Sequence, residues 1–267
     1  MIRSLTYLYM GLLLVSLLAG CRASRVLFPE IHDGDTNWLK RESSHYFIYY
    51  RPGSPASQDI NKIAKTLDSC FEDVLTQLEV DFSNKISYYL YNSSDDLDRW
   101  AKWHRWGFFV GEFEYAVGVY DSIHKRINSH ETVHVIAYHT IGMAAKLIFL
   151  NEGLAEAVTH YHERDLRGRL FIHVSCQSLF YEGKLFSLDI LADNDRFKEI
   201  YLSPEGCNYY IQSGSFVRHL IDQYGLAKFK FLLPRAGENN YKNIFQEMYG
   251  KNIHDFVKEW HDFLRNY

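Results

Sequence analysis

The hydrophobic periodicity of the 267-residue chain changes near residue 123, and this change constrains the fold more than any other feature. Before it, β-branched and aromatic runs predict strands over residues 45–51, 85–91 and 114–122. Between the first two runs, apolar residues three and four apart predict a helix over 57–78, and the polar cap at Ser93 predicts another. The first part of the chain therefore predicts strands joined by helices.

After residue 123 the pattern is mainly helical. Predicted helices cover residues 124–141, 150–165, 208–224, 226–233, 240–248 and 253–265. Strands first and helices afterwards indicate an α+β fold with its chemistry at the junction. We therefore expect one domain over 37–267, with a small mixed sheet and its helices in 37–123 and a mainly helical part in 124–267.

Trp100, Trp103 and Trp106 form an aromatic run in the first part of the chain. Such a run can be a surface patch for a membrane or a ligand, or it can be core. Helical spacing is more typical of core packing, and we favour that interpretation.

The first twenty residues have the composition of an export signal. Arg3 supplies a positive start, and residues 4–20 are uncharged, rich in leucine and too short for a comfortable membrane span. The segment ends Leu-Ala-Gly-Cys, which resembles a bacterial lipobox, and this resemblance implies that Cys21 carries a lipid. A plain secretory peptide with an incidental Cys21 is the alternative.

Lipidation would tether the domain through residues 21–36 to a bacterial membrane, facing the periplasm or the cell surface. Arg22 stands where an aspartate is associated with inner-membrane retention, which favours the outer membrane. Export also permits disulfides. Cys70, Cys176 and Cys207 allow at most one bridge, with Cys176 and Cys207 as a candidate pair, and no spacing among them resembles a zinc or redox motif.

The charge distribution argues against a nucleic-acid partner. The formal net charge is −4, and the sequence has no basic block and no stripe of alternating basic and aromatic residues.

His130-Glu131-Thr132-Val133-His134 is an H-E-x-x-H motif. On a helix, residues four apart project from nearly one face, so His130 and His134 can bind a single Zn²⁺. Glu131 lies one step round the helix, where its carboxylate can reach a metal-bound water. A catalytic zinc takes three protein ligands, so a third donor must come from elsewhere.

His139 lies in the same run but does not fit as that donor. The metzincin motif requires glycine at 137 and histidine at 140, where this chain has Ala137 and Thr140. Five residues past His134 on a helix, His139 points about 140° away. We interpret it as a helix-surface or packed histidine.

The segment Asn-Glu-Gly-Leu-Ala-Glu at 151–156 follows the motif, and the combination resembles the gluzincin metallopeptidases. This resemblance implies that Glu152 is the third zinc ligand. It also implies that Glu156, at i+4 on the same helix face, orients the first ligand histidine, as such carboxylates do. A solvated helix charge is the alternative for Glu156.

A further resemblance, to the peptidase MA-like bacterial domains, covers nearly all of residues 37–267 and implies a zincin-like fold. In the related aminopeptidase N family, a helix tyrosine hydrogen-bonds the oxyanion. Alignment of residues 209–225 with that helix implies this role for Tyr210, with Tyr209 as the alternative. The G-A-M-E-N segment of those aminopeptidases is missing, so their specificity is not implied.

The sequence therefore predicts a membrane-anchored zinc metallopeptidase acting on peptide or protein substrates in the cell envelope. Its ligands are His130, His134 and Glu152; Glu131 is the general base and Tyr210 the oxyanion donor. The strand around 116–120 is expected at the cleft edge, where it would pair with an extended peptide.

Two other functions remain open. One is a catalytically silent, zinc-stabilised envelope scaffold or binding lipoprotein, against which Glu131 argues because a structural site has no use for a base. The other is an interaction module without a metal.

Overall fold

The computed structural model describes residues 37–98, 107–110, 114–123, 125–142 and 147–267. The predicted signal peptide, the tether, Cys21 and the three tryptophans of the aromatic run lie outside these residues.

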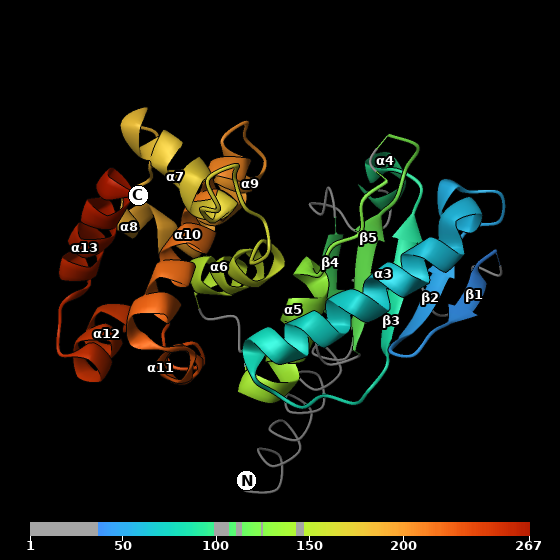
Figure 1. The fold of residues 1–267 in the computed structure, drawn as a ribbon, viewed down its shortest axis with the longest axis horizontal. Coiled ribbons are helices and arrows are strands. Elements are labelled where there is room, and N and C mark those ends of the chain that lie inside the picture. Colours follow the sequence, from blue (N-terminus) through green and yellow to red (C-terminus); the bar gives the residue numbers. More distant parts are fainter. Residues whose placement is uncertain (1–36, 99–106, 111–113, 124, 143–146) are drawn as a thin grey trace, which may run out of the picture.

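A five-stranded sheet forms the first part of the chain (Figure 1). The strands are ordered β1-β2-β3-β5-β4; β2, β3 and β5 are parallel, and the two outer strands run antiparallel to their neighbours. The first strands are β1 (Leu39–Glu42), β2 (Tyr46–Tyr50) and β3 (Ile86–Tyr91), and the others are β4 (Gly107–Val110) and β5 (Tyr115–Val119). The three predicted strands are confirmed, whereas β1 and β4 were not predicted.

Two helices accompany the sheet, α3 (Pro55–Leu78) between β2 and β3, and the short α4 (Ser94–Asp98) after β3. Pro55 at the start of α3 and the Ser54 side chain, which accepts from the Ser57 N–H, explain why α3 begins there. Alternate residues of each strand face opposite sides. Tyr88 and Leu90 therefore join the core cluster that contains α3, while Tyr89 and Tyr91 join a separate cluster on the other face.

The structure contradicts the prediction that the strand around 116–120 pairs with an extended peptide, because it has no free edge. β5 pairs with β3 on one side and with β4 on the other, and all five of its residues are buried. Burial of both faces is typical of an internal strand. The edge next to the helical part is β4.

Nine helices make up the described remainder of the chain. They are α5 (His130–Ile141), α6 (Ile148–Thr159), α7 (Phe171–Tyr181), α8 (Leu188–Leu191), α9 (Asn194–Tyr201), α10 (Gly206–Tyr224), α11 (Leu226–Leu232), α12 (Tyr241–Tyr249) and α13 (Ile253–Asn266). The mixed α+β class is confirmed, and α7, α8 and α9 were not predicted. Within the part of the chain that the structure describes, no helix has both the length and the apolar character needed to cross a membrane.

Two predicted helix boundaries were wrong. The helix predicted over 124–141 begins only at His130, because residues 125–128 are non-helical and Asn128 Oδ1 accepts from the His130 N–H. The helix predicted over 150–165 ends at Thr159. There Asp165 folds the following loop by accepting from the backbone N–H groups of Arg167 and Arg169.

The three described cysteines, Cys70, Cys176 and Cys207, are free thiols. The candidate pairing of Cys176 with Cys207 is therefore wrong. Cys176 is buried in α7 and Cys207 is exposed at the start of α10.

A buried polar network joins α7, α10 and α13. His173 Nδ1 lies 2.9 Å from Ser215 Oγ, and the indole Nε1 of Trp260 donates to the same oxygen at 3.1 Å. Burial, helped by the nearby charges of His219 and Arg218, lowers the pKa of His173 to about 3. The folded protein therefore holds this imidazole in its neutral form.

His173 should make the protein sensitive to acid. Its pKa is lower in the folded protein than its ordinary 6.5, so its contribution to stability is complete above pH 6.5 and declines as pH falls toward 3. Each unit by which the pH falls below 6.5 lowers the free energy of unfolding by up to about 1.4 kcal/mol. Between pH 7.5 and 5, denaturant unfolding should show wild type losing about 2 kcal/mol more than His173→Asn, which keeps an acceptor for Ser215. Equal losses would contradict the assignment.

Candidate metal centre

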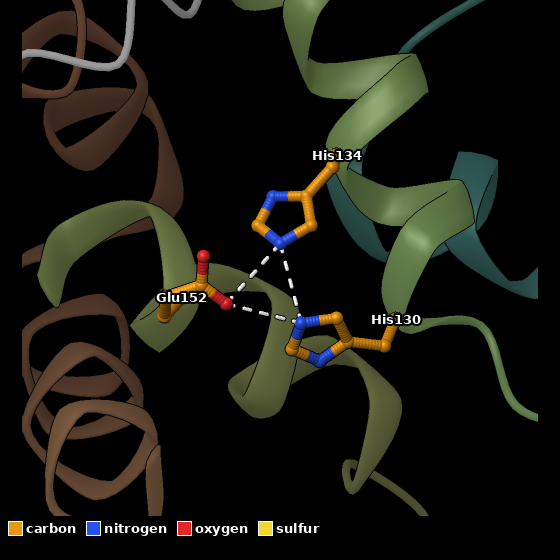
Figure 2. Close-up of side chains that lie close together, drawn as sticks. All are labelled: His130, His134 and Glu152. Atoms are coloured by element: carbon orange, nitrogen blue, oxygen red, sulfur yellow. Dashed lines mark hydrogen bonds and ion pairs between the residues drawn. The ribbon is translucent and has the colours of Figure 1, made fainter. Parts of the chain in front are cut away.

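Three side chains that can bind a metal converge between α5 and α6 (Figure 2). One donor atom from each of His130, His134 and Glu152 lies within 4.8 Å of the other two. His130 Nε2 is 3.2 Å from His134 Nε2 and 3.1 Å from Glu152 Oε2, and His134 Nε2 is 3.4 Å from the same carboxylate oxygen. The three predicted ligands are thus brought together, and they could bind a metal ion.

The spacing of the donor atoms fits a small tetrahedral cation. Zinc binds imidazole nitrogen and carboxylate oxygen at about 2.0–2.2 Å, so two ligands of a tetrahedral site are separated by about 3.3 Å. The three observed separations are 3.1, 3.2 and 3.4 Å. Two imidazoles and one carboxylate are also a donor set that catalytic zinc sites use, and they leave the fourth position to water.

Local geometry explains how the ligands meet. His130 and His134 lie one turn apart on α5, and Glu152 lies in the second turn of α6. Gly142 ends α5 in the left-handed conformation (φ 78°), which glycine adopts at little cost. Beside the ligands, Ser129 Oγ donates to Thr159 Oγ1 at 3.2 Å and joins the start of α5 to the end of α6.

α5 is also fixed to the sheet. Thr132 Oγ1 and Tyr46 Oη lie 2.9 Å apart in the buried core, so the first turn of α5 is hydrogen-bonded to β2. The position of the two histidines therefore depends on the sheet as well as on their own helix.

α6 approaches α10 unusually closely, and glycines make this possible. A Cβ on Gly153 would lie 2.6 Å from the Ser213 carbonyl oxygen, and a Cβ on Gly214 would lie 2.6 Å from Glu156 Cβ. Real Cβ atoms do not approach so closely. The residues beside Glu152 thus press directly against α10.

Glu156 contacts the first ligand histidine. Its Oε1 accepts from His130 Nδ1 at 2.8 Å, and its Oε2 lies 3.1 Å from His160 Nε2. Burial by itself raises the pKa of Glu156, but the hydrogen bonds from the two histidines outweigh burial and hold it at about 2. In turn, the hydrogen bond with Glu156 raises the pKa of His160 to about 8, with help from Glu163 at 3.0 Å.

Glu131 is half-buried at the wall of the cavity and faces the first residue of β4. A Cβ on Gly107 would lie 2.9 Å from Glu131 Oε1 and 2.5 Å from the Val117 carbonyl oxygen. Burial is the main cause that raises the pKa of Glu131. Sequence reasoning missed Gly107, and the only signal for it was the short apolar run that it begins.

The structure separates the two candidate tyrosines. Tyr209 is fully buried, and its hydroxyl donates to the Leu191 carbonyl oxygen at 3.0 Å. Tyr210 lines the cavity of the site, and its ring centroid lies 6.0 Å from that of His130. Of the two tyrosines, only Tyr210 therefore lines the cavity beside His130.

A cavity of about 710 Å³ adjoins the ligands, a size typical of small-molecule and peptide sites. One wall comes from β3, β4, β5 and the residues before α5, and the other from α6, the loop after it, α7, α9 and α10. The second wall carries apolar side chains, among them Phe171, Ile172 and Ile211. Phe171 and its neighbours in α7 were missed because α7 itself was not predicted.

His139 lies apart from the ligands, as expected. It is exposed at the end of α5 and stacks on Phe82, with ring centroids 5.4 Å apart. It does not join the described group of metal donors.

No protein-family model matches the chain, and no curated protein matches it.

Glu156 should control metal affinity through His130. Glu156→Gln removes the charge that holds the imidazole, and loss of such a partner costs about 10–100-fold in affinity. Competition titration with a zinc chelator should show this loss. Glu163→Gln is the matched control, because Glu163 contacts His160 and touches no ligand, and its affinity should stay near that of wild type. Equal affinities for all three proteins would contradict the role of Glu156.

Proposed function

We propose that the protein is a zinc-dependent metallopeptidase of the gluzincin type with a zincin-like domain. One observation carries the proposal: the donor atoms of His130, His134 and Glu152 converge, and His130 lines one cavity together with Glu131 and Tyr210. A structural zinc site needs only the ligands. An acid and a phenol beside them are what hydrolysis requires.

His130, His134 and Glu152 would hold the ion. When bound, Zn²⁺ polarises the scissile carbonyl and lowers the pKa of its bound water. The three side chains supply two neutral donors and one charge, which leaves a net positive site for the carbonyl oxygen.

Glu131 serves as the general base in this proposal. Its carboxylate takes a proton from the attacking water and passes it to the nitrogen of the leaving amine, so that one residue completes both transfers. Gly107 leaves room for this carboxylate at the cavity wall.

Tyr210 serves as the oxyanion donor. Its hydroxyl would donate a hydrogen bond to the former carbonyl oxygen as negative charge develops there. α10 carries it to the opposite side of the site from Glu131, so that base and donor act on different atoms of the peptide bond.

β4 provides a place for the peptide backbone. It is the outer strand on this side of the described sheet, and Gly107 lines the cavity. An extended peptide could add to this edge by backbone hydrogen bonds, which would hold it regardless of its side chains.

The proposal includes a location in the bacterial envelope. The signal-like residues 1–20 and the lipobox-like Cys21 would attach the enzyme to a membrane, with envelope peptides or proteins as its substrates.

Glu131→Gln should separate metal binding from turnover. The amide cannot take a proton, so cleavage of a peptide library should fall about 10³-fold while zinc content, measured by atomic absorption, stays at the wild-type level. A wild type that holds zinc and cleaves nothing would instead identify a silent scaffold. Unchanged turnover in the variant would overturn the role of Glu131.

Tyr210→Phe should lower kcat by about 10–10³-fold with little change in KM, because the hydrogen bond forms only as the oxygen becomes charged. Tyr209→Phe is the matched control on the neighbouring residue. It breaks the bond to the Leu191 carbonyl and should reduce stability rather than kcat. If the two variants have the same kcat, Tyr210 is not the donor.

A further inference from the structure

The charged side chains that line the cavity differ in whether they form ion pairs with other residues. Glu156 and Glu163 both pair with His160, and Glu156 also pairs with His130. Arg126 is the only lysine or arginine among the described lining residues. No hydrogen bond or ion pair joins it to any residue that the structure describes.

The contacts of the residues on either side of Arg126 explain why its side chain lies at the cavity. Lys125 Nζ binds Asp59 Oδ2 on α3 at 2.9 Å, and Ile127 packs on the main core. Lys125 therefore faces away from the site, and the two contacts fix the backbone on either side of Arg126. Between two anchored residues, Arg126 lines the cavity wall.

We propose that Arg126 binds a carboxylate of the substrate, so that the enzyme prefers peptides with an anionic group near the scissile bond. This inference rests on the proposed peptidase function and specifies its substrate class. A guanidinium presents a planar fork of N–H donors that matches a carboxylate, often through two parallel hydrogen bonds. It is also always charged, so it attracts anions throughout the physiological pH range.

The position of Arg126 limits where the carboxylate lies. Arg126 precedes the first ligand, His130, by four residues, which span at most about 14 Å of extended chain. The two side chains add to this span, and a bound peptide advances about 3.3 Å per residue, so the anionic group lies within several residues of the scissile bond.

The rest of the cavity sharpens this preference. Apart from the histidines and the metal they would hold, the other ionisable carboxylates that line it are Glu131, Glu156 and Glu163, whose negative charges disfavour a carboxylate placed beside them. The apolar side chains of α7 and α10 offer no partner for an anion. Arg126 therefore selects both the charge and its place.

Two sources can supply the carboxylate, an acidic side chain or the carboxyl terminus of the peptide. Four peptides built on one sequence that the wild type cleaves distinguish these two sources. They carry either Glu or Gln at one position, and their carboxyl terminus is either free or amidated. Their binding to zinc-loaded, full-length Glu131→Gln protein, followed by fluorescence anisotropy, tests recognition without turnover. The same measurement is repeated with Arg126→Gln added, and with Lys125→Gln as the control that removes a neighbouring charge already paired with Asp59.

Arg126→Gln should lower the affinity of at least one carboxylate-bearing peptide tenfold or more and leave the affinity of the neutral, amidated Gln peptide unchanged. Lys125→Gln should leave the affinities of all four peptides unchanged. The peptide that loses affinity identifies the source. Equal affinities with and without Arg126, or an equal loss with Lys125→Gln, would overturn the inference.

Failure of the proposed peptidase activity can be distinguished from failure of carboxylate binding by Arg126. If the wild type cleaves none of a peptide library, peptides from that library that bind the zinc-loaded protein serve as the probes. Dependence of their binding on Arg126 would then support carboxylate recognition in a protein that is no peptidase.

Discussion

Four ionisable side chains, His130, His134, Glu152 and Glu156, lie largely buried together between α5, α6 and α10, and the site depends on how the cost of this burial is offset. Isolated charges in such a place are costly, so they persist only when they satisfy one another. Glu156 does this through two histidines, at 2.8 and 3.1 Å. The other three direct their donor atoms at one point, where a metal cation satisfies all of them at once.

A single helix contact then determines how Glu152 lies relative to Tyr210. Gly153, next to Glu152, lies against the Ser213 carbonyl, and Tyr210 precedes Ser213 by about one turn of α10. The packing that brings Glu152 to the histidines therefore also brings Tyr210 to the cavity. A larger residue at 153 would move both together, because its Cβ would overlap the backbone of α10.

The sequence predicts the part of the site that depends on local geometry. The i, i+4 spacing on one helix is enough to place His130 beside His134, and the same spacing places Glu156 one turn beyond Glu152. Gly107 could not be found in this way, because it lines the cavity only through the packing of a distant strand. His160, four residues after Glu156, and Arg126, four before His130, lie close to the site in sequence but carry no motif that marks them. The edge position was wrongly given to β5, since β4 has only four residues and shows little periodicity. α8, which also has only four residues, was not predicted for the same reason.

The candidate ligands come from two helices that pack against different parts of the fold, and this has a consequence for stability. α5 belongs with the sheet, to which Thr132 ties it, whereas α6 belongs with the helical part, against α10 (Figure 1). A metal held by His130, His134 and Glu152 therefore joins the two parts where the cavity opens. Because the unfolded chain has no preformed site, the free energy of binding becomes free energy of folding. The cation would hold Glu131 on one wall in register with Tyr210 on the other, so the same contact would serve both stability and catalytic geometry.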